Sequence, residues 1–558
     1  MKLIILSFIV IFSYAKYDSK FILQWNNILH LENKTFSQQS FYLSYPYVNW
    51  ENELILDLNE IKNKNKNFIC AFPYRYVFLS KYFHLSKFNI MKNCPKVNFF
   101  LHSFQKDKVG IVFSSEYSMS PQSAFGHVML IFKDNNKSLL TSDVVHFAAV
   151  VKKEGFFKYS YNGLTGKFPA FYIREKLFKK YYLYNLIQQR SMFIYWLNFN
   201  KKDIQNLILH IYELNKFKAH YYFLNYNCST AIIELLNSIK LEQNYDHLII
   251  LPIKSVSLYH KNIKHIQKLI PLDKQLLLLY QKMDYKEKNI FNQIVLMKYK
   301  GNFKSLSNII KEASVKLYQY MFYNKKMVYP NYNEVSKLNY QKEKLNLKKI
   351  KNPLQKTLPC EIYFFKDIKN NNYLFTLRPF LISKYDIENN LLEEKVYNIF
   401  TPTFLVKKHN LKLQQFDLIN SESMIKNYSF IKDISWKLYA GLNRENYNNN
   451  LTGEIELGFG NTYPINNQFF INYLINGGID FGDFNNIYIK PEINVVLYSN
   501  NKLKIENNLN YKVFINRKIY YQNDIFFSAK IAKQLIGIIS YIKESENNKL
   551  LVGLGYNF

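Results

Sequence analysis

The sequence predicts a chain with two parts, a mixed α+β region followed by an antiparallel transmembrane β-barrel. Three observations lead to this prediction. The length of 558 residues is about three to four times that of a typical domain. Apolar residues follow mixed helical and strand spacings in the first part, and from about residue 360 they alternate with a period of two. The chain also opens with the pattern of an export signal.

The export signal occupies residues 1–15. Lys2 provides the positive start, and Leu3–Phe12 is an apolar run that is too short to span a bilayer. Ser13–Ala15 has the small-x-small pattern of a cleavage site. We expect a signal peptide that is removed after Ala15; the alternative is a short membrane anchor. Export by this signal would place the mature chain in an oxidising compartment, where disulfides form.

The region between the signal and the barrel is expected to have three parts. Residues 16–105 mix short helical patterns with polar loops, and residues 106–245 show the pattern of an α+β core. Within that core we expect strands at 109–114, 127–132 and 144–151, and helices at 172–198, 203–216 and 229–240. Residues 246–355 are expected to be helical, and they end in a charged linker near Pro353.

The four cysteines have different expected roles. Cys70 and Cys94 are close in sequence, and we predict that they form a disulfide. Cys360 is expected to be incidental. Cys228 lies in an unusual motif that is considered below.

Residues 356–558 have the pattern of an outer-membrane β-barrel. Segments such as 469–481 and 487–498 alternate apolar and polar side chains, and short Asn-rich turns separate them. The final segment, KLLVGLGYNF, ends in the aromatic Phe558 and resembles the terminal strand of such barrels. We predict about ten to twelve strands, since bacterial barrels prefer even numbers. The alternative is a soluble β-sandwich with one wet face. The predicted location is the outer membrane of a Gram-negative cell, with the N-terminal domain in the periplasm.

The net charge of +32 comes almost entirely from lysine, because only six of the 74 basic residues are arginine. Nucleic-acid grooves usually use arginine as well, whose planar fork binds phosphate and guanine. We therefore expect no nucleic-acid partner. The basic surface suits the anionic lipid of a membrane, so outer-membrane lipid is the expected partner.

Two motifs suggest thiol chemistry. In NYNCST, Asn227 suits a helix N-cap, which would place Cys228 in the first helical turn, where the positive helix end favours a thiolate. In SAFGHVML, His127 on a strand could accept the thiol proton, and His146 on the next strand could orient it. The alternatives are a buried cysteine at a helix start and satisfied core histidines.

These motifs lie within a longer resemblance to the N-terminal periplasmic domain family of Lnb, the lipoprotein N-acyltransferase. It extends through much of residues 20–300 and is carried in order by WNNILHL, CAFPYRYVFL, SAFGHVMLIF, QQRSMFIYWLN and YYFLNYNCSTAIIELL. The His-then-Cys order also resembles permuted papain-like (NlpC-like) folds, such as the lecithin:retinol acyltransferase group. The resemblance implies that Cys228 is the nucleophile and His127 the general base, with His146 as the orienting residue.

Three further residues are candidates for supporting roles. Arg190 matches a family position associated with arginine, and its alternative role is a structural ion pair on a helix. Ser123 and Asn225 flank the two motifs and are expected to hydrogen-bond near the site. The sequence has neither HExxH nor CxxC, so no metal or other cofactor is expected.

Three functions are compatible with these motifs. The first is a thiol acyltransferase or acyl hydrolase that attacks an ester of a lipid, a phospholipid or a lipoprotein through an acyl-thioester. The second is a periplasmic cysteine peptidase or amidase, since the same dyad serves that chemistry. The third is a non-catalytic outer-membrane protein whose periplasmic domain binds a partner.

Overall fold

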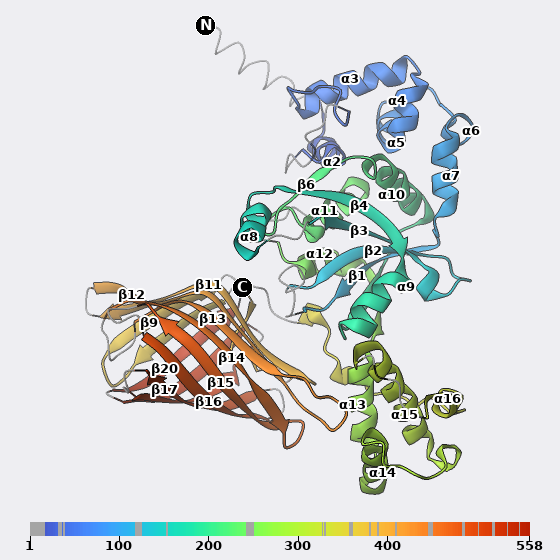
Figure 1. Ribbon diagram of the computed structural model, residues 1–558. Coiled ribbons are helices and arrows are strands. Elements are labelled where there is room, and N and C mark those ends of the chain that lie inside the picture. The colour runs from blue at the N-terminus through green and yellow to red at the C-terminus, as the bar shows by residue number, and fades with distance from the viewer. Residues whose placement is uncertain are drawn as a thin grey trace. The chain divides into compact units, whose positions relative to one another are not determined.

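The computed structural model describes most of the chain in two compact units, divided between Pro271 and Leu272 (Figure 1). The described residues are 17–31, 36, 40–117, 125–151, 155–240, 250–325, 327, 331–355, 361–378, 381–387, 390–407, 410–444, 450–481, 486–499, 502–515, 519–532, 534–545 and 547–557. The expected signal peptide, Ser123 and Cys360 lie outside them.

The first unit is built on a seven-stranded antiparallel sheet with the order β6-β4-β3-β2-β1-β5-β7. Its strands are β1 (Lys108–Ser114), β2 (His127–Lys133), β3 (Asp143–Ala149), β4 (Phe168–Lys176), β5 (Met192–Leu197), β6 (Ala219–Tyr221) and β7 (Ile263–Leu269). The central strands β1, β2 and β5 are buried over nearly their whole length because helices cover both faces of the sheet. The strands expected near residues 109, 127 and 144 are confirmed as β1, β2 and β3.

Helices surround this sheet. They are α2 (Ser19–Leu29), α3 (Trp50–Lys62), α4 (Lys66–Ala71), α5 (Pro73–Tyr82), α6 (Ile90–Asn93), α7 (Pro95–Ser103), α8 (Phe156–Leu164), α9 (Leu177–Lys180), α10 (Lys201–Leu214), α11 (Cys228–Ile239) and α12 (Pro252–Leu258). Helices α10 and α11 pack on one face of the sheet; α9 and the π-helix Tyr181–Ile187 that continues it pack on the other. The predicted helices at 203–216 and 229–240 are confirmed as α10 and α11.

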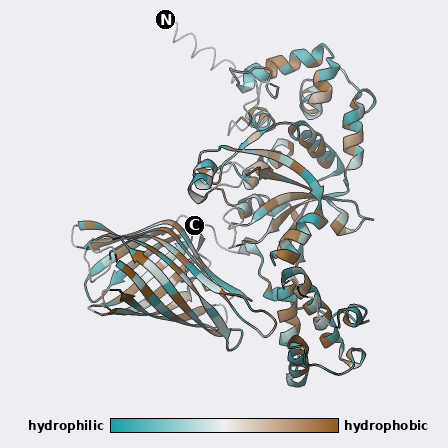
Figure 2. Ribbon diagram, in the orientation of Figure 1, coloured by the Kyte–Doolittle hydropathy of each residue, from teal (hydrophilic) through white to brown (hydrophobic). Residues whose placement is uncertain are grey.

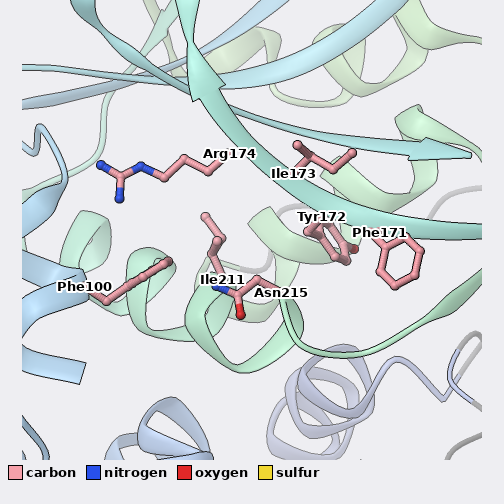
Figure 3. A pocket seen from close by; sticks show the side chains of 7 residues that line it. All are labelled: Phe100, Phe171, Tyr172, Ile173, Arg174, Ile211 and Asn215. Carbon is pink, nitrogen blue, oxygen red and sulfur yellow. The ribbon is translucent and has the colours of Figure 1, made fainter. Parts of the chain in front are cut away.

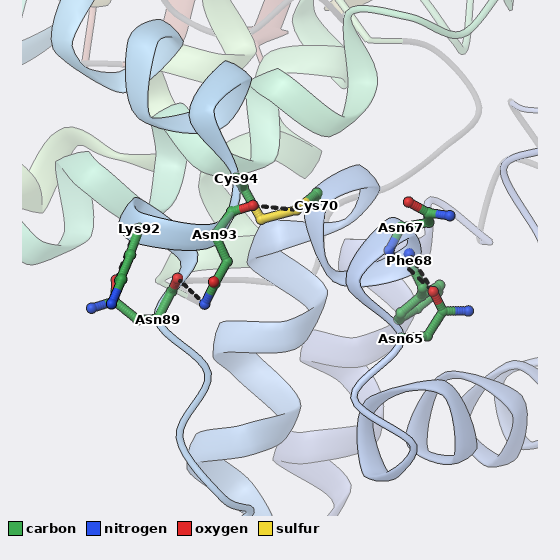
Figure 4. The surroundings of a disulfide bond; sticks show 8 residues. All are labelled: Asn65, Asn67, Phe68, Cys70, Asn89, Lys92, Asn93 and Cys94. Carbon is green, nitrogen blue, oxygen red and sulfur yellow. Dashed lines mark hydrogen bonds between the residues drawn. A yellow bond between two sulfur atoms is a disulfide. The ribbon is translucent and has the colours of Figure 1, made fainter.

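The disulfide between Cys70 and Cys94 is confirmed, with a Cα–Cα distance of 5.4 Å (Figure 4). It links α4 to the residue that precedes Pro95, the first residue of α7. The two cysteines are 24 positions apart in sequence, so the bond closes a short loop of helices.

Two regions expected to be helical contain strands. Residues 172–198 hold the end of β4, a helical stretch over 177–187 and then β5, so the helical prediction is confirmed for 177–187 and wrong at both ends. The run MFIYWL is apolar at every position because β5 is a buried central strand, and such a run does not show the alternation of a half-buried strand. The segment 246–355 likewise supplies β7, whose lysines lie on the exposed edge of the sheet.

The second unit begins with four helices, α13 (Leu272–Lys282), α14 (Tyr285–Val295), α15 (Asn308–Tyr320) and α16 (Tyr332–Val335). Tyr280 of α13 packs against Phe430, in the turn between two barrel strands, at a ring distance of 5.2 Å. No helix within the described ranges has both the length and the apolarity to cross a membrane.

The rest of this unit is a closed antiparallel barrel of twelve long strands. They are β8 (Glu361–Asp367), β9 (Asn372–Arg378), β11 (Glu393–Lys407), β12 (Asn410–Ile425), β13 (Ser435–Asn443), β14 (Thr452–Pro464), β15 (Phe469–Asp480), β16 (Asn486–Ser499), β17 (Leu503–Phe514), β18 (Ile519–Lys530), β19 (Leu535–Glu544) and β20 (Asn548–Asn557). The barrel closes because β20 pairs with β8 and β9 pairs with β11. The two-residue strand β10 (Leu381–Ile382) attaches to β11. The predicted barrel is confirmed, and closure excludes the sandwich alternative.

The barrel wall has an apolar outer surface and a largely polar inner one (Figure 2). On β14, Leu457 is 52% exposed and Phe459 60%, whereas the inward-facing Glu456 is 1% exposed. This alternation matches a wall that contacts lipid on the outside. The period-two pattern of the sequence therefore indicated correctly which side chains face outward.

Candidate thiol site

Cys228 is the first residue of α11, as the cap motif predicted. The Asn227 side chain accepts a hydrogen bond of 2.8 Å from the amide of Ser229, and its own amide group donates to the carbonyl of Ile250 at 2.7 Å. These bonds fix the start of the helix from both sides. The Cys228 residue is 3% exposed and forms no disulfide.

The Cys228 thiol is held against the backbone of β2. Burial raises its pKa above the ordinary value, and the amides of Val128, Cys228 and Ser229, with the Tyr221 hydroxyl, oppose this shift because they favour the thiolate. The thiol is therefore neutral in the resting site and needs a base to ionise. The same amide groups would also stabilise negative charge that forms next to the sulfur during a reaction.

The approach to β2 is possible because β2 and β3 diverge at this end. Their pairing covers only Leu130–Phe132 against Asp143–Val145, although β2 starts at His127 and β3 continues to Ala149. The amide of Val128 therefore has no partner strand on its β3 side. The thiol lies at this opening between the strands.

His127 and His146 lie on the other face of the sheet from α11. Both share the face of Met129, which packs against α9 and the π-helix, whereas Phe147 faces Tyr226 next to α11. The two imidazole rings are edge to face, with centroids 5.7 Å apart. Among the described residues, neither imidazole is hydrogen-bonded to the Cys228 thiol. The structure thus brings the two histidines together. It places the thiol at the opening between β2 and β3, next to Val128, the residue that follows His127 on β2.

Both imidazoles are held in the neutral form. Burial lowers the pKa of His127 well below its usual range, and the nearby His146, Arg190 and Lys180 lower it further. Burial also lowers the pKa of His146 to about 4, with a further contribution from Lys180. Within the part of the chain that is described, Nε2 of His127 and both ring nitrogens of His146 have no hydrogen-bond partner. A neutral imidazole with an open nitrogen can accept a proton.

Arg190 supports this face from the loop before β5, not from a helix as one alternative assumed. Its guanidinium donates to the carbonyls of Ser115 at 2.6 Å and Ser114 at 3.2 Å, at the end of β1. It also lies over the ring of Tyr184, 4.5 Å from its centroid. That ring in turn contacts His127 with centroids 6.0 Å apart. Arg190 thus holds the aromatic wall behind His127.

Asn225 shapes the turn before Cys228 and points to solvent. Its side-chain oxygen accepts from the amide of Tyr226 at 3.0 Å, and its carbonyl accepts from the Thr230 hydroxyl. The expected role of Ser123 stays a prediction, since Ser123 lies outside the described residues.

A second buried polar cluster near α11 was not predicted from the sequence. Nδ1 of His30 is 2.5 Å from Oε2 of Glu234, and its Nε2 is 3.2 Å from Nε2 of His210. Nδ1 of His210 is 2.8 Å from Oε2 of Glu213, and the Tyr226 hydroxyl donates to Glu234 at 2.8 Å. We call Glu234, His30, His210 and Glu213 the histidine relay. The available signal was the i, i+3 spacing of His210 and Glu213 in the apolar second half of α10.

Three close contacts join the members of the histidine relay, and satisfying all three as hydrogen bonds would need three protons. Two neutral imidazoles supply two of them. Burial raises the pKa of Glu213 to about 7, so this carboxyl can share the third proton. The relay connects α2, α10 and α11 and ends at Tyr226, two residues before Cys228.

A cavity of about 560 Å³ opens elsewhere in the first unit (Figure 3). Arg174 at its edge is already bound to Asp143, with Nη2 3.0 Å from Oδ1. None of the candidate site residues lines the cavity, whose lining residues are Phe100, Phe171, Tyr172, Ile173, Arg174, Ile211 and Asn215. No group of three His, Cys, Asp or Glu side chains able to hold a metal occurs among the residues described.

Comparison with known proteins identifies two family matches. Residues 96–262 match the Lnb N-terminal periplasmic domain, which confirms the resemblance seen in the motifs. Residues 371–549 match a domain of unknown function, DUF7840, which covers most of the barrel. No curated protein matches the chain.

Solved outer-membrane proteins align with about a third of the chain. The KdgM porin in complex with disordered oligogalacturonate aligns at 10% identity and a TM-score of 0.25, over 36% of this chain and 98% of its own. The NanC porin aligns at 8% identity and a TM-score of 0.24, over 36% and 100%. Omp33 of Acinetobacter baumannii aligns at 9% identity and a TM-score of 0.20, over 36% and 99%.

The family match and the barrel together indicate the cellular location of this protein. The first unit includes the region that matches the Lnb N-terminal periplasmic domain, and the closed barrel has the apolar outer surface of a membrane protein. This is an outer-membrane protein with its N-terminal domain in the periplasm, as the sequence predicted.

Proposed function

We propose that this chain is an outer-membrane-anchored cysteine acyltransferase or acyl hydrolase, acting on the acyl esters of phospholipids or lipoproteins. The observation that best supports this proposal is the position of the Cys228 thiol at the start of α11. Backbone amides surround the thiol, and the neighbouring strand β2 begins with the neutral His127. The proposal includes a permuted papain-like fold for the first unit, in which the cysteine opens a helix and the histidine lies on a strand.

The reaction would proceed through an acyl-thioester. His127 takes the thiol proton, and the thiolate sulfur forms a bond to the ester carbonyl carbon, whose oxygen becomes negative near the amides of Val128 and Cys228. Collapse breaks the carbon–oxygen bond, and the imidazolium of His127 protonates the departing alcohol. An amine or a water molecule then attacks the thioester, loses a proton to His127 and regenerates the thiol.

The barrel supports the choice of an acyl ester as substrate. It anchors the chain in a membrane that is itself composed of acyl esters, so donor molecules are at high local concentration. The matching domain takes its name from Lnb, a lipoprotein N-acyltransferase, which transfers an acyl chain within lipoproteins. A peptidase or amidase would use the same residues, because its substrate also forms an acyl-enzyme.

A non-catalytic, partner-binding domain is the second candidate function, and one observation favours it. The Cys228 thiol is buried, and it is not hydrogen-bonded to either imidazole of the described site. A structural cysteine would have the same environment.

Mass spectrometry of the intact protein tests the proposal. The detergent-solubilised full chain is incubated with membrane lipids and with a diacylated lipopeptide, beside Cys228→Ala and the matched control Cys360→Ser. We expect one added acyl chain on the natural chain and on the control, and none on Cys228→Ala. An unmodified Cys228 with every lipid, together with peptide release from sacculi, would favour the peptidase. Absence of both reactions would favour the partner-binding domain.

A further inference from the structure

We infer that the lumen of the barrel is sealed, so that the barrel anchors the chain and does not conduct solutes. This inference concerns the second unit alone and does not depend on the proposed function. It rests on three features of the described part of the lumen: an apolar core, an inward-folded segment, and polar contacts that cross from one wall to another.

A packed apolar core fills one end of the lumen. It combines buried side chains from β8, β15, β16, β18 and β19, represented by Tyr363, Phe470, Val496, Phe526 and Ile538. These strands lie on several sides of the barrel, so their side chains meet across the interior. A water-filled channel instead has a polar interior.

The segment Ser383–Ile387, here called the inner segment, folds into this core. The Tyr385 ring lies 4.9 Å from that of Phe526 and 5.4 Å from that of Tyr363, measured between centroids. Nζ of Lys384 is 2.8 Å from Oδ2 of Asp524 on β18, and the carbonyl of Lys384 accepts from Lys504 on β17 at 2.6 Å. The inner segment is therefore bonded to the neighbouring strands β17 and β18, and Tyr385 also packs against β8.

In addition to the apolar contacts, polar side chains bridge the lumen. Lys437 on β13 pairs with Glu492 on β16 at 2.8 Å. The Tyr498 hydroxyl on β16 donates to Glu394 on β11 at 3.0 Å, a contact between strands with four others between them. A direct bond of this kind between distant strands needs their side chains to span the interior.

The exposure of the inner wall supports a seal near the apolar core. Asn472, Asn476 and Ser528, all on the lumen side, have 0% exposure. Asn508 and Asn510, farther from the apolar core on the lumen side of β17, are only partly buried. The end of the lumen that holds the apolar core is thus packed in the manner of a protein core.

Planar-bilayer recording of the full chain is the first test. With potassium chloride on both sides, we expect no discrete conductance steps at any holding potential that the membrane tolerates. A barrel of known conductance, inserted in the same membranes, serves as the positive control. Stable unitary openings of the natural chain would overturn the inference.

Thiol labelling tests the same point without a membrane current. In a Cys228→Ala, Cys360→Ser background, Ser528→Cys reports on the lumen, and Gln468→Cys, at an exposed turn, is the matched control. A charged, water-soluble thiosulfonate is expected to label position 468 in the folded barrel and position 528 only after heat unfolding. Rapid labelling of position 528 in the folded, heat-modifiable barrel would contradict a sealed lumen.

Replacement of the inner segment by glycines sharpens this result. We expect it to increase the labelling rate at position 528 at least tenfold, because the apolar core loses Tyr385 and Ile387. An unchanged rate, in a variant that keeps its heat-modifiable gel shift, would show that the inner segment is not part of the seal.

Discussion

The first unit contains two pairs of neighbouring histidines, and the two pairs differ in how their ring nitrogens are used. His30 and His210 have all four nitrogens within hydrogen-bond distance of a partner, and their rings stack with centroids 5.3 Å apart. In contrast, His146 has no partner for either nitrogen, and Nε2 of His127 has none among the described residues. Buried polar groups are normally satisfied, so an unsatisfied pair needs another explanation. The comparison shows that the first pair is held by polar partners, whereas the second pair keeps open ring nitrogens of the kind that the proposed function requires.

The largest expected effect is on the rate of the proposed acyl transfer. His127→Gln is expected to lower acyl transfer by about 10²–10⁴-fold, the usual contribution of a general base. The exposed His102→Gln is the matched control and should leave the rate unchanged. The measurement is the rate of thioester formation on Cys228. A rate within a factor of two of the natural chain would exclude His127 as the base.

The second prediction concerns stability and removes one carboxylate from the histidine relay. Glu234→Ala removes the buried hydrogen-bond partner of His30 and of the Tyr226 hydroxyl and is expected to lower the free energy of unfolding by about 1–3 kcal/mol. Urea unfolding followed by tryptophan fluorescence measures this, since Trp25, Trp50 and Trp196 lie in the first unit. Glu234→Gln, which keeps the shape and one acceptor, should lose less. Equal losses for His127→Gln and Glu234→Ala would remove the distinction between the two pairs.

The pH dependence of stability follows from the lowered pKa of His146. Between about 4, its folded pKa, and about 6.5, the usual pKa of an unfolded histidine, the unfolded chain binds a proton that the folded chain does not. Stability therefore rises with pH through this window, by about 3 kcal/mol from His146 alone. Glu213 acts in the opposite direction, because its raised pKa makes the folded chain the stronger proton binder between about 4.5 and 7.

A pair of variants separates these two contributions. His146→Asn should flatten the rise in stability between pH 4 and 6.5, and Glu213→Gln should steepen it. Unfolding midpoints in urea at a series of pH values measure both slopes. A His146→Asn variant with the slope of the natural chain would contradict burial of a neutral imidazole at this position.

The smallest expected effect concerns the wall behind His127. Arg190→Lys keeps the positive charge but loses the planar fork that binds two carbonyls and covers Tyr184. We expect the variant to unfold about 1–2 kcal/mol more easily and to show a small loss of turnover. Full rescue of both stability and rate by lysine would show that only the charge at position 190 matters.

The barrel was the part of the fold that the sequence predicted best, and the reason is physical. Each strand has lipid on one side and the lumen on the other, so side chains such as Leu457 and Glu456 must alternate. In the first unit, β5 has both faces covered, and its run of apolar residues resembles a buried helix segment. Periodicity alone could not separate the two.

The site was predictable only where its determinants are local. Asn227 caps the helix that starts with Cys228, and both residues belong to one motif. The contact between the thiol and the Val128 amide depends on where β2 and β3 separate, which no local pattern records. The histidine relay is still less visible in sequence, since His30 and Glu234 are 204 positions apart.

Barrel closure also sets an order on how the chain is made. Strand β8 starts at Glu361, and its closing partner β20 ends at Asn557, so the seam joins the first and last long strands to be synthesised. The first unit ends at Pro271 and shares no strand with that seam. The barrel can therefore close only after the last strand of the chain has been made, whereas every strand of the first unit precedes β8.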